Sequence, residues 1–199
     1  MPTPEPSGGS LGRGARARIL AAAQTCFSRQ GMVATSVNDL RAQARVSKRT
    51  LYEHFPSKDE LLIAYLGERG LSAAETVLDR EQLTPRARLL ELFTALGAAE
   101  HARPDPVLAA AIEFPDRAHA VHRAATHQSE RLLGRLRALA EAAGAADPDQ
   151  TARQLALVYA GAAARLLVDD AEAVIGDAHR LAASILRAAI DHSGTDRST

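Results

Sequence analysis

The chain has 199 residues, of which 46% are hydrophobic and 24% charged, and its formal net charge is zero. This length and composition are ordinary for one globular domain or two small ones. Aromatic residues make up only 4%, alanine is abundant and runs of β-branched residues are missing, which argues against a sheet protein and predicts an all-α fold. The single cysteine, Cys26, excludes an internal disulfide framework and a cysteine-based zinc cluster.

No segment has the pattern of a membrane span or a secretion signal. The longest nearly apolar run, Leu155 to Val168, is interrupted by Arg165 and is short for a span. Met1 to Gly14 lacks the basic start and apolar core of a signal peptide. We therefore expect a cytoplasmic protein without a membrane partner, and no motif calls for a cofactor.

The zero net charge hides an asymmetry along the chain. Residues 1–58 contain nine Lys and Arg against three Asp and Glu, a net charge of +6, which leaves −6 for the remainder. A basic front suggests that this part meets a polyanion. Chance clustering would give the same count, so the split alone leaves nucleic-acid binding open.

The front of the chain is predicted to hold a compact group of helices. Residues 1–14 are rich in Pro, Gly and Ser and are expected to be disordered. Apolar spacing then predicts helices over 15–30, 37–44 and 48–54 and a longer one from 58. Gly31 is placed to end the first helix, and Ser36, Ser47 and Ser57 are placed to cap the next three.

The rest of the chain repeats one helix-start signal. A capping side chain precedes a proline at Thr84-Pro85, Asp105-Pro106 and Asp147-Pro148. We expect helices at about 85–101, 106–113, 117–143, 148–168 and 172–191, which makes about nine in all. No segment alternates convincingly like a strand.

The second and third helices are joined by only a few residues, as in pairs that place the second helix in the major groove. Leu51 and Phe55 would anchor the third helix inward, which puts Arg49, Thr50 and Glu53 roughly on the opposite side. Arginine can donate two hydrogen bonds to guanine, threonine can contact a thymine methyl and glutamate can accept from cytosine. A small structural helix with a solvated basic face is the alternative interpretation.

The stretch from Arg18 to Leu62 resembles the N-terminal DNA-binding domain of TetR/AcrR-family transcriptional regulators. The matching elements are Phe27 and Gly31, Thr35-Ser36-Val37, Ala44-x-Val46-Ser47, Leu51-Tyr52-x-His54-Phe55 and Ser57-Lys58-x-x-Leu61. The resemblance implies a helix-turn-helix domain over 15–60 and a larger helical effector-binding and dimerisation domain over 61–192. Residues 193–199 would form a disordered tail.

One position departs from the family pattern. The family usually has glycine in the turn, where this chain has Arg45. Arginine at positive φ costs roughly 1 kcal/mol, which glycine avoids. A phosphate contact by the Arg45 side chain would offset this cost. The other interpretation is that the side chain is a neutral part of the surface.

The resemblance implies which positions contact DNA. Tyr52 and Lys58 are expected at phosphates and Arg49 and Thr50 at base edges, while His54 either contacts DNA or packs. The full set of expected DNA-binding residues is Ser36, Arg45, Ser47, Lys48, Arg49, Thr50, Tyr52, His54 and Lys58. Arg13, Arg16 and Arg18 either extend as an arm along the DNA or form a solvated tail.

The last two helices suit a dimer interface, because one recognition helix reads only a short half-site. A small-residue surface at 160–164 permits close approach, and the family usually dimerises through these helices; packing within one subunit is the alternative. The expected interface residues are Tyr159, Ala160, Ala163, Ala164, Leu167, Leu181, Ala182, Ile185 and Ala189.

The helices between 59 and 168 would enclose a cavity for a small-molecule effector, although core packing is the commoner fate of their apolar residues. The candidate effector-binding residues are Phe93, His101, Ile112, Glu113, His122 and His127. A metal site built from Glu113 and nearby histidines is disfavoured, because His119, His122 and His127 spread around the helix and Pro115 separates Glu113 from them.

The sequence therefore predicts a transcriptional regulator rather than an enzyme. The leading hypothesis is a repressor that binds a (pseudo)palindromic double-stranded DNA operator as a homodimer and is released by an unknown small-molecule effector. An activator or an effector-independent DNA-binding protein is the alternative, and an enzyme with a site in the back half is a remote one. A protein that coats DNA without sequence preference would show a steep salt dependence only.

Overall fold

The computed structural model describes residues 9–69, 72–96 and 105–195, and within these ranges it contains ten α-helices and no strand. The all-α prediction is thus confirmed. The helices are α1 Gly9–Gln30, α2 Val37–Ala44, α3 Lys48–His54, α4 Lys58–Arg69, α5 Ser72–Leu78, α6 Pro85–Ala95, α7 Pro106–Glu113, α8 Ala120–Ala142, α9 Pro148–Arg165 and α10 Ala171–Thr195. None of them is both long and apolar enough to cross a membrane.

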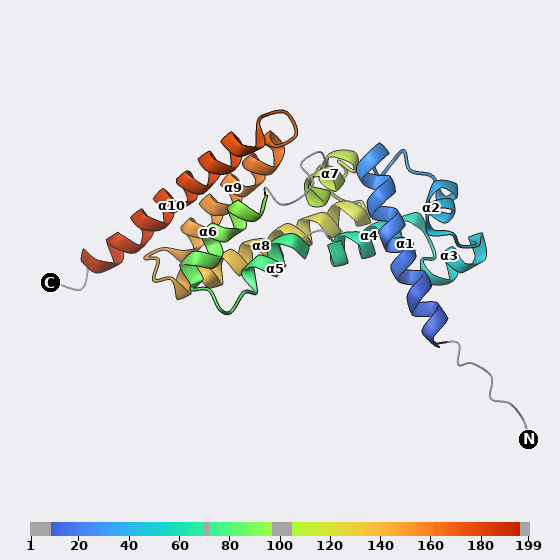
Figure 1. The fold of residues 1–199 in the computed structure, drawn as a ribbon, viewed down its shortest axis with the longest axis horizontal. Helices are drawn as coiled ribbons and strands as arrows, with labels where there is room; N and C mark the ends of the chain where they lie inside the picture. The colour runs from blue at the N-terminus through green and yellow to red at the C-terminus, as the bar shows by residue number, and fades with distance from the viewer. Residues whose placement is uncertain (1–8, 70–71, 97–104, 196–199) are drawn as a thin grey trace, which may run out of the picture.

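Figure 1 shows an elongated molecule with α1, α2 and α3 at one end and α9 and α10 at the other. The long helix α8 runs from the pair α9 and α10 toward α4, and it packs against both α4 and α9. We call α1–α4 the reading head and α5–α10 the back domain. α7 and α8 are the parts of the back domain that reach the reading head (Figure 1).

Local signals set most helix starts. The side chains of Ser36, Ser47, Thr84, Asp105 and Asp147 each accept a hydrogen bond from a backbone N–H in the first turn, as predicted. These caps satisfy donors that would otherwise lack partners at a helix start. They therefore fix where α2, α3, α6, α7 and α9 begin.

Some helix bounds differ from the prediction. α1 begins at Gly9, six residues before the predicted start, because a helix already nucleated on its buried face extends at low cost into flanking residues. A tenth helix, α5, is separate, whereas the sequence pattern did not divide 58–84. α8 begins only at Ala120, because the ring of His119 caps it, and α9 ends at Arg165 instead of 168.

Two clusters of buried apolar residues form the core. The first fills the reading head and includes Leu51 and Phe55, with Ala110 of α7 and Val121 and Ala125 of α8 completing it. The second lies within the back domain, and the half-buried Val107 of α7 packs against both clusters. Apolar burial therefore joins the reading head to α7 and α8 as well as filling each part.

Candidate nucleic-acid interface

Local hydrogen bonds define both ends of α2, including the turn that leads into α3. Ser36 and Asp39 form a reciprocal capping box at the start of α2, and the bonds from Ser36 hold the pKa of the Asp39 carboxyl below its usual value. At the other end, Arg45 has φ 53° and ψ 50°, and the N–H of Val46 donates to the carbonyl of Arg41 at 3.1 Å. Arg45 thus occupies the left-handed position where glycine usually ends a helix.

The left-handed backbone expected at Arg45 is confirmed. It is the sole residue other than glycine with a positive φ among those that the structure describes. Its side chain is exposed beside the start of α3. The turn therefore pays a backbone cost and gains an exposed positive charge next to the candidate recognition helix.

α3 is held by its inner residues and presents its outer ones. Leu51 and Phe55 are 1% and 3% exposed in the core of the reading head. Ser47 caps the helix, and its hydroxyl also bonds the hydroxyl of Thr50 at 2.9 Å. Arg49 lies on the outer side with its side chain 88% exposed. A rigid helix with an exposed basic side chain is the geometry that reading a groove requires.

Arg49 is already oriented by a neighbour on α3. Its Nε donates to Oε1 of Glu53 at 2.8 Å, one turn further along the helix, and this pairing raises the pKa of the guanidinium. The bond occupies Nε alone, so the two terminal nitrogens keep the paired donors that match guanine O6 and N7. Glu53 therefore either orients Arg49 or reads cytosine itself.

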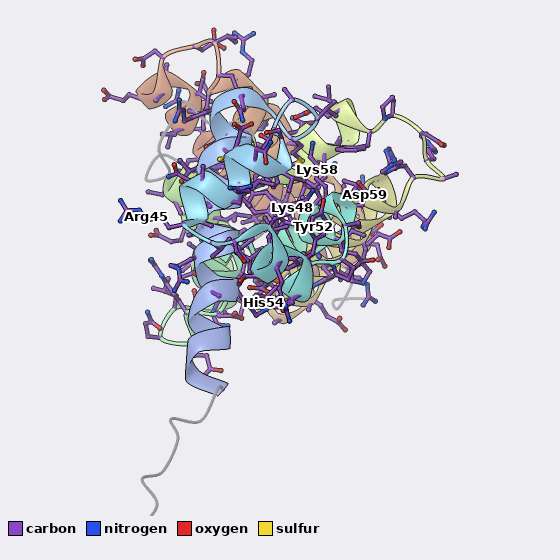
Figure 2. The ribbon with its side chains drawn as sticks, turned by 90° about the vertical axis from the view of Figure 1, so that its right-hand side faces the viewer. Arg45, Lys48, Tyr52, His54, Lys58 and Asp59 are labelled. Atoms are coloured by element: carbon purple, nitrogen blue, oxygen red, sulfur yellow. The ribbon has the colours of Figure 1, made fainter. Side chains whose placement is uncertain are left out.

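The other expected contact residues surround α3. Figure 2 shows Arg45 at one edge, Lys48 and Tyr52 in the middle and His54 at the lower edge of this end of the molecule. Lys48 and Tyr52 are exposed, with the ammonium of Lys48 5.9 Å from the centre of the Tyr52 ring. His54 is half-buried with its ring tilted 6.5 Å from that of Phe55, so part of it packs.

Lys58 lies at the start of α4, on the side opposite Arg45 in Figure 2. It is half-buried, and its Nζ donates to the carbonyl of Val33 in the loop between α1 and α2 at 2.8 Å. Burial lowers the pKa of this ammonium, and the charges of Asp59 and Glu113 act in the opposite direction. One of its three donors thus serves the fold, and a phosphate contact through the other two stays a prediction.

The basic residues of α1 do not all take one of the two predicted roles, an arm along the DNA or a solvated tail. Arg16 forms an ion pair with Glu68 of α4, and its guanidinium lies 5.4 Å from the centre of the Phe55 ring. Arg16 therefore joins α1 to α3 and α4 as a packing residue, which neither of the two predicted roles included. Arg18 is exposed, and the side chain of Arg13 lies outside the described residues.

The candidate effector residues do not line one common cavity or surface. Phe93 is fully buried in the core of the back domain, whereas Ile112 and His127 are exposed. His122 bonds the carbonyl of Phe114 at 2.7 Å, which ties the ring to the backbone after α7. His101 lies outside the described residues. Phe93 and His122 thus have structural roles that the periodicity of the sequence could not separate from ligand contact.

Glu113, the remaining candidate, faces the reading head. Its carboxylate accepts from the backbone N–H groups of Met32 and Val33. Nothing in the sequence signals this contact, because about 80 residues separate the partners. An effector contact at Glu113 stays a prediction, and in this structure both carboxylate oxygens accept hydrogen bonds from the loop between α1 and α2.

The expected dimer residues divide between the surface and the core. Ala160, Leu167 and Leu181 are exposed, which leaves them free for a partner. Ala182 is fully buried in its own subunit, so its assignment to the interface is wrong, because it faces the core on the inner side of α10. The remaining expected interface residues are half-buried: Tyr159, Ala163, Ala164, Ile185 and Ala189. Of these, Tyr159 and Ile185 pack against the core of the back domain.

The ring of Tyr159 points inward. Burial raises the pKa of its hydroxyl, and the negative charge of Asp105, which caps α7, adds to this effect. Burial raises the pKa of the Asp105 carboxyl as well. The back domain thus keeps two polar groups largely out of solvent and near enough to affect each other, which the small-residue pattern around Tyr159 did not reveal.

Comparisons with known proteins agree with this geometry. The family described as "Bacterial regulatory proteins, tetR family" matches residues 19–65, which include α2, α3 and the turn between them. The chain is 28% identical over 179 residues to the HTH-type transcriptional regulator YjdC of Escherichia coli, covering 86% of this chain and 93% of that protein.

Two solved structures resemble the whole fold. The TetR-family regulator SCO4454 of Streptomyces coelicolor has a TM-score of 0.80 at 28% identity, with 89% of this chain and 96% of that chain covered. A putative TetR transcriptional regulator of Streptomyces avermitilis has a TM-score of 0.73 at 38% identity, with 88% and 97% covered. With this identity over nearly the whole length, and with an anchored α3 that exposes its basic side, the chain belongs to the TetR family of DNA-binding transcriptional regulators.

Proposed function

We propose that the chain is a repressor that binds a (pseudo)palindromic operator as a homodimer and releases it when a small molecule binds the back domain. The observation that carries the proposal is α3, which is fixed by Leu51 and Phe55 and exposes Arg49. Two such helices one DNA turn apart would read two half-sites. One relative, a Mycobacterium tuberculosis protein named as a transcriptional repressor, is 39% identical over 54 residues.

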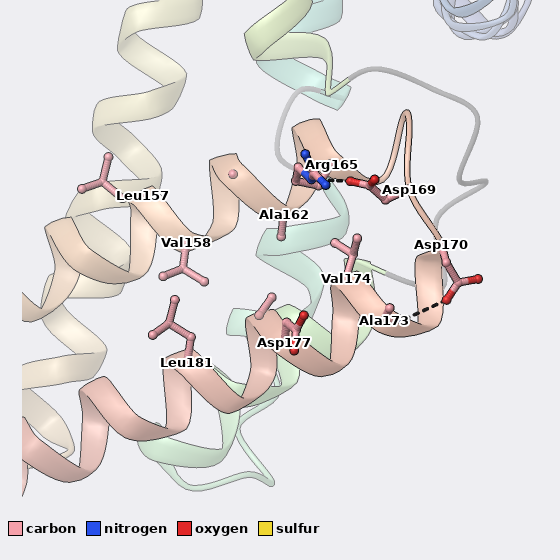
Figure 3. A pocket seen from close by; sticks show the side chains of 12 residues that line it. Leu157, Val158, Ala162, Arg165, Asp169, Asp170, Ala173, Val174, Asp177 and Leu181 are labelled. Atoms are coloured by element: carbon pink, nitrogen blue, oxygen red, sulfur yellow. Dashed lines mark hydrogen bonds and ion pairs between the residues drawn. The ribbon is translucent and has the colours of Figure 1, made fainter.

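The surface of α9 and α10 supports the homodimer. A groove of about 710 Å³ lies between these helices, and Val158 of α9 faces Leu181 of α10 across it, with Leu157 among the residues that line it (Figure 3). Leu157, Val168 and Leu181 are 74%, 77% and 53% exposed. Apolar surface of this kind is covered in most folded proteins, and a second copy packed on α9 and α10 would cover it.

The effector response follows from linkage. A small molecule changes DNA affinity only if it binds one spacing of the two reading heads more tightly than the other. The back domain is joined to the reading head through α7 and α8, so a shift of these helices would change that spacing.

The operator is tested by selecting bound duplexes from a random pool with the full chain. The proposal expects a recovered motif with two-fold symmetry and half-sites about one DNA turn apart. In transcription with purified components, the chain should then lower output from a promoter that carries the motif. Equal binding to all duplexes, or raised transcription, would contradict the proposal.

The homodimer is tested by sedimentation of the Leu157→Glu variant. A charge at this position should dissociate the dimer, because it cannot be solvated once the groove is covered. Ile112→Glu is the matched control, since Ile112 is similarly exposed but lies on α7, away from the groove. A dimer that survives Leu157→Glu and Leu181→Glu would show that the interface lies elsewhere.

A further inference from the structure

Glu113, the last residue of α7, reaches across the boundary between the two parts of the molecule. Its Oε1 accepts from the N–H of Met32 at 3.0 Å, and its Oε2 accepts from the N–H of Val33 at 2.7 Å. Both donors lie in the loop between α1 and α2, which leads directly into the helix-turn-helix. One carboxylate of the back domain therefore holds two successive amides of the reading head.

The loop is shaped to receive this carboxylate. Gly31 has φ 87°, and a Cβ added there would lie 3.2 Å from both carboxylate oxygens of Glu113. Glycine at this position thus supplies the left-handed turn and leaves room for the close approach. Met32 is buried in the core of the reading head, so its backbone moves with that core.

Lys58 holds the same loop from the reading head. Its Nζ donates to the carbonyl of Val33, the residue whose N–H binds Glu113. The positive charge of Lys58 and the negative charge of Glu113 attract each other across the loop. Val33 therefore has both of its backbone groups fixed, one by α4 and the other by α7.

The carboxyl end of α7 is in turn tied to α8. His122 bonds the carbonyl of Phe114, the residue after Glu113, and the rings of Phe114 and His119 lie 4.9 Å apart. A displacement of α8 or α7 would therefore carry Glu113 with it. The shared apolar cluster also joins these helices to the head, but apolar contacts slide more readily than directed hydrogen bonds do.

We infer that Glu113 is a positioning residue for the reading head: by holding the amides of Met32 and Val33, it makes the orientation of α1–α4 depend on the position of α7. The inference rests on the proposed function for its regulatory meaning, because DNA release requires reoriented heads. The positioning of the head by Glu113 is a property of the free protein, so it can be tested without DNA or effector.

The test measures the distance between the two parts of the full chain. Spin labels at Gln43→Cys on α2 and Glu130→Cys on α8 use two exposed positions, and Cys26 is buried. Labelled chain is diluted with unlabelled chain so that each assembly holds at most one labelled subunit. Glu113→Ala should shift or broaden the distance distribution, and Glu113→Gln, which keeps one acceptor, should have a smaller effect.

Asp116→Asn is the matched control, because it removes a negative charge three residues away whose carboxylate accepts from the N–H of Ala118. It should leave the distance distribution unchanged. An unchanged distribution in Glu113→Ala, even with a lowered melting temperature, would overturn the inference by reducing Glu113 to a stabilising contact. An equal effect of Asp116→Asn and Glu113→Gln would also overturn it, because charge alone would then explain both.

Amide exchange and DNA affinity complete the test. In Glu113→Ala the amides of Met32 and Val33 should exchange faster than in the parent, and unchanged exchange would contradict the clamp. Binding to the selected duplex should weaken about tenfold, because a loosened head must be ordered on binding. If the parent binds no duplex, the proposed function fails, while the distance and exchange measurements still decide the role of Glu113.

Discussion

The reading head and the back domain expose opposite kinds of surface. The head buries most of its large apolar side chains, with Val33 and Tyr52 as exceptions, and leaves Arg45, Lys48 and Arg49 at the surface. The back domain leaves Leu157 and Leu181 exposed along α9 and α10, and acidic Asp170 and Asp177 line the same groove (Figure 3). A basic surface suits a polyanion and an apolar groove suits protein, so each part is completed by a different class of partner.

The largest expected effect is the difference in stability loss when a leucine is replaced by alanine in the reading head and in the back domain. Leu51→Ala should lower the free energy of unfolding by about 2–5 kcal/mol, because it removes a buried anchor of α3 and leaves a cavity. Leu157→Ala, at an exposed position, should cost far less in a diluted, monomeric sample. Urea unfolding of both variants measures the difference.

The same two variants should also differ in how they bind DNA. Leu51→Ala should also weaken DNA binding by each subunit, because α3 loses its fixed orientation, whereas Leu157→Ala should weaken it only through loss of the dimer. Equal losses of stability in the two variants would contradict the assignment of Leu157 to a surface and Leu51 to the core.

The next effect concerns base reading by the head. Arg49→Ala should lose about 1–3 kcal/mol of discrimination at one base position of the operator, because the guanidinium would read a guanine there. The stability of the chain should hardly change, since the ion pair with Glu53 is exposed. Binding to a panel of single-base operator variants measures the discrimination.

Glu53→Gln separates the two roles left open for Glu53. It keeps an acceptor for Nε of Arg49, so an orienting role predicts that base preference is retained. A changed preference at a cytosine would instead show that Glu53 reads a base directly, and an unchanged preference in Arg49→Ala would remove Arg49 from base reading.

A smaller effect is expected at the turn before α3. Arg45→Gly should raise stability by about 1 kcal/mol, because glycine adopts the left-handed backbone without strain. Its DNA affinity should fall if the guanidinium reaches a phosphate. Arg45→Ala is the control: it removes the same charge but keeps the strain.

Thermal unfolding and DNA titration of both variants decide between the interpretations of Arg45. Equal stability of the two variants would show that the backbone carries no strain. Unchanged affinity in both would leave the side chain as neutral surface.

The two parts also differ in how far their sequence foretells their structure. The caps at Ser36 and Ser47 depend on neighbours in the chain, so local patterns predicted them, whereas the left-handed turn at Arg45 was expected from the resemblance to the family. The apolar periodicity at Ala182 and Phe93 would be the same if these residues faced a partner, a ligand or the core. Only the packing of distant helices determines that both lie in the core. Glu113 depends on residues 80 positions away, which no local pattern encodes.

The smallest expected effect concerns the pH dependence of the capping box in the head. Because hydrogen bonds from Ser36 lower the pKa of Asp39, its carboxylate stabilises the folded chain above its usual pKa of 3.8. This contribution is lost as the pH falls through the lower pKa of the folded state. Asp39→Asn keeps an acceptor for Ser36 but does not titrate, so its stability should depend less on pH.

Urea unfolding of the parent and of Asp39→Asn between about pH 5 and about pH 3 measures this difference. The parent should lose more stability over this range than the variant, and amide exchange should place the loss at the start of α2. Parallel curves for the two chains would mean that the hydrogen bonds of Asp39 do not depend on its charge. The cap would then act through geometry alone, as the uncharged cap of Ser47 does at α3.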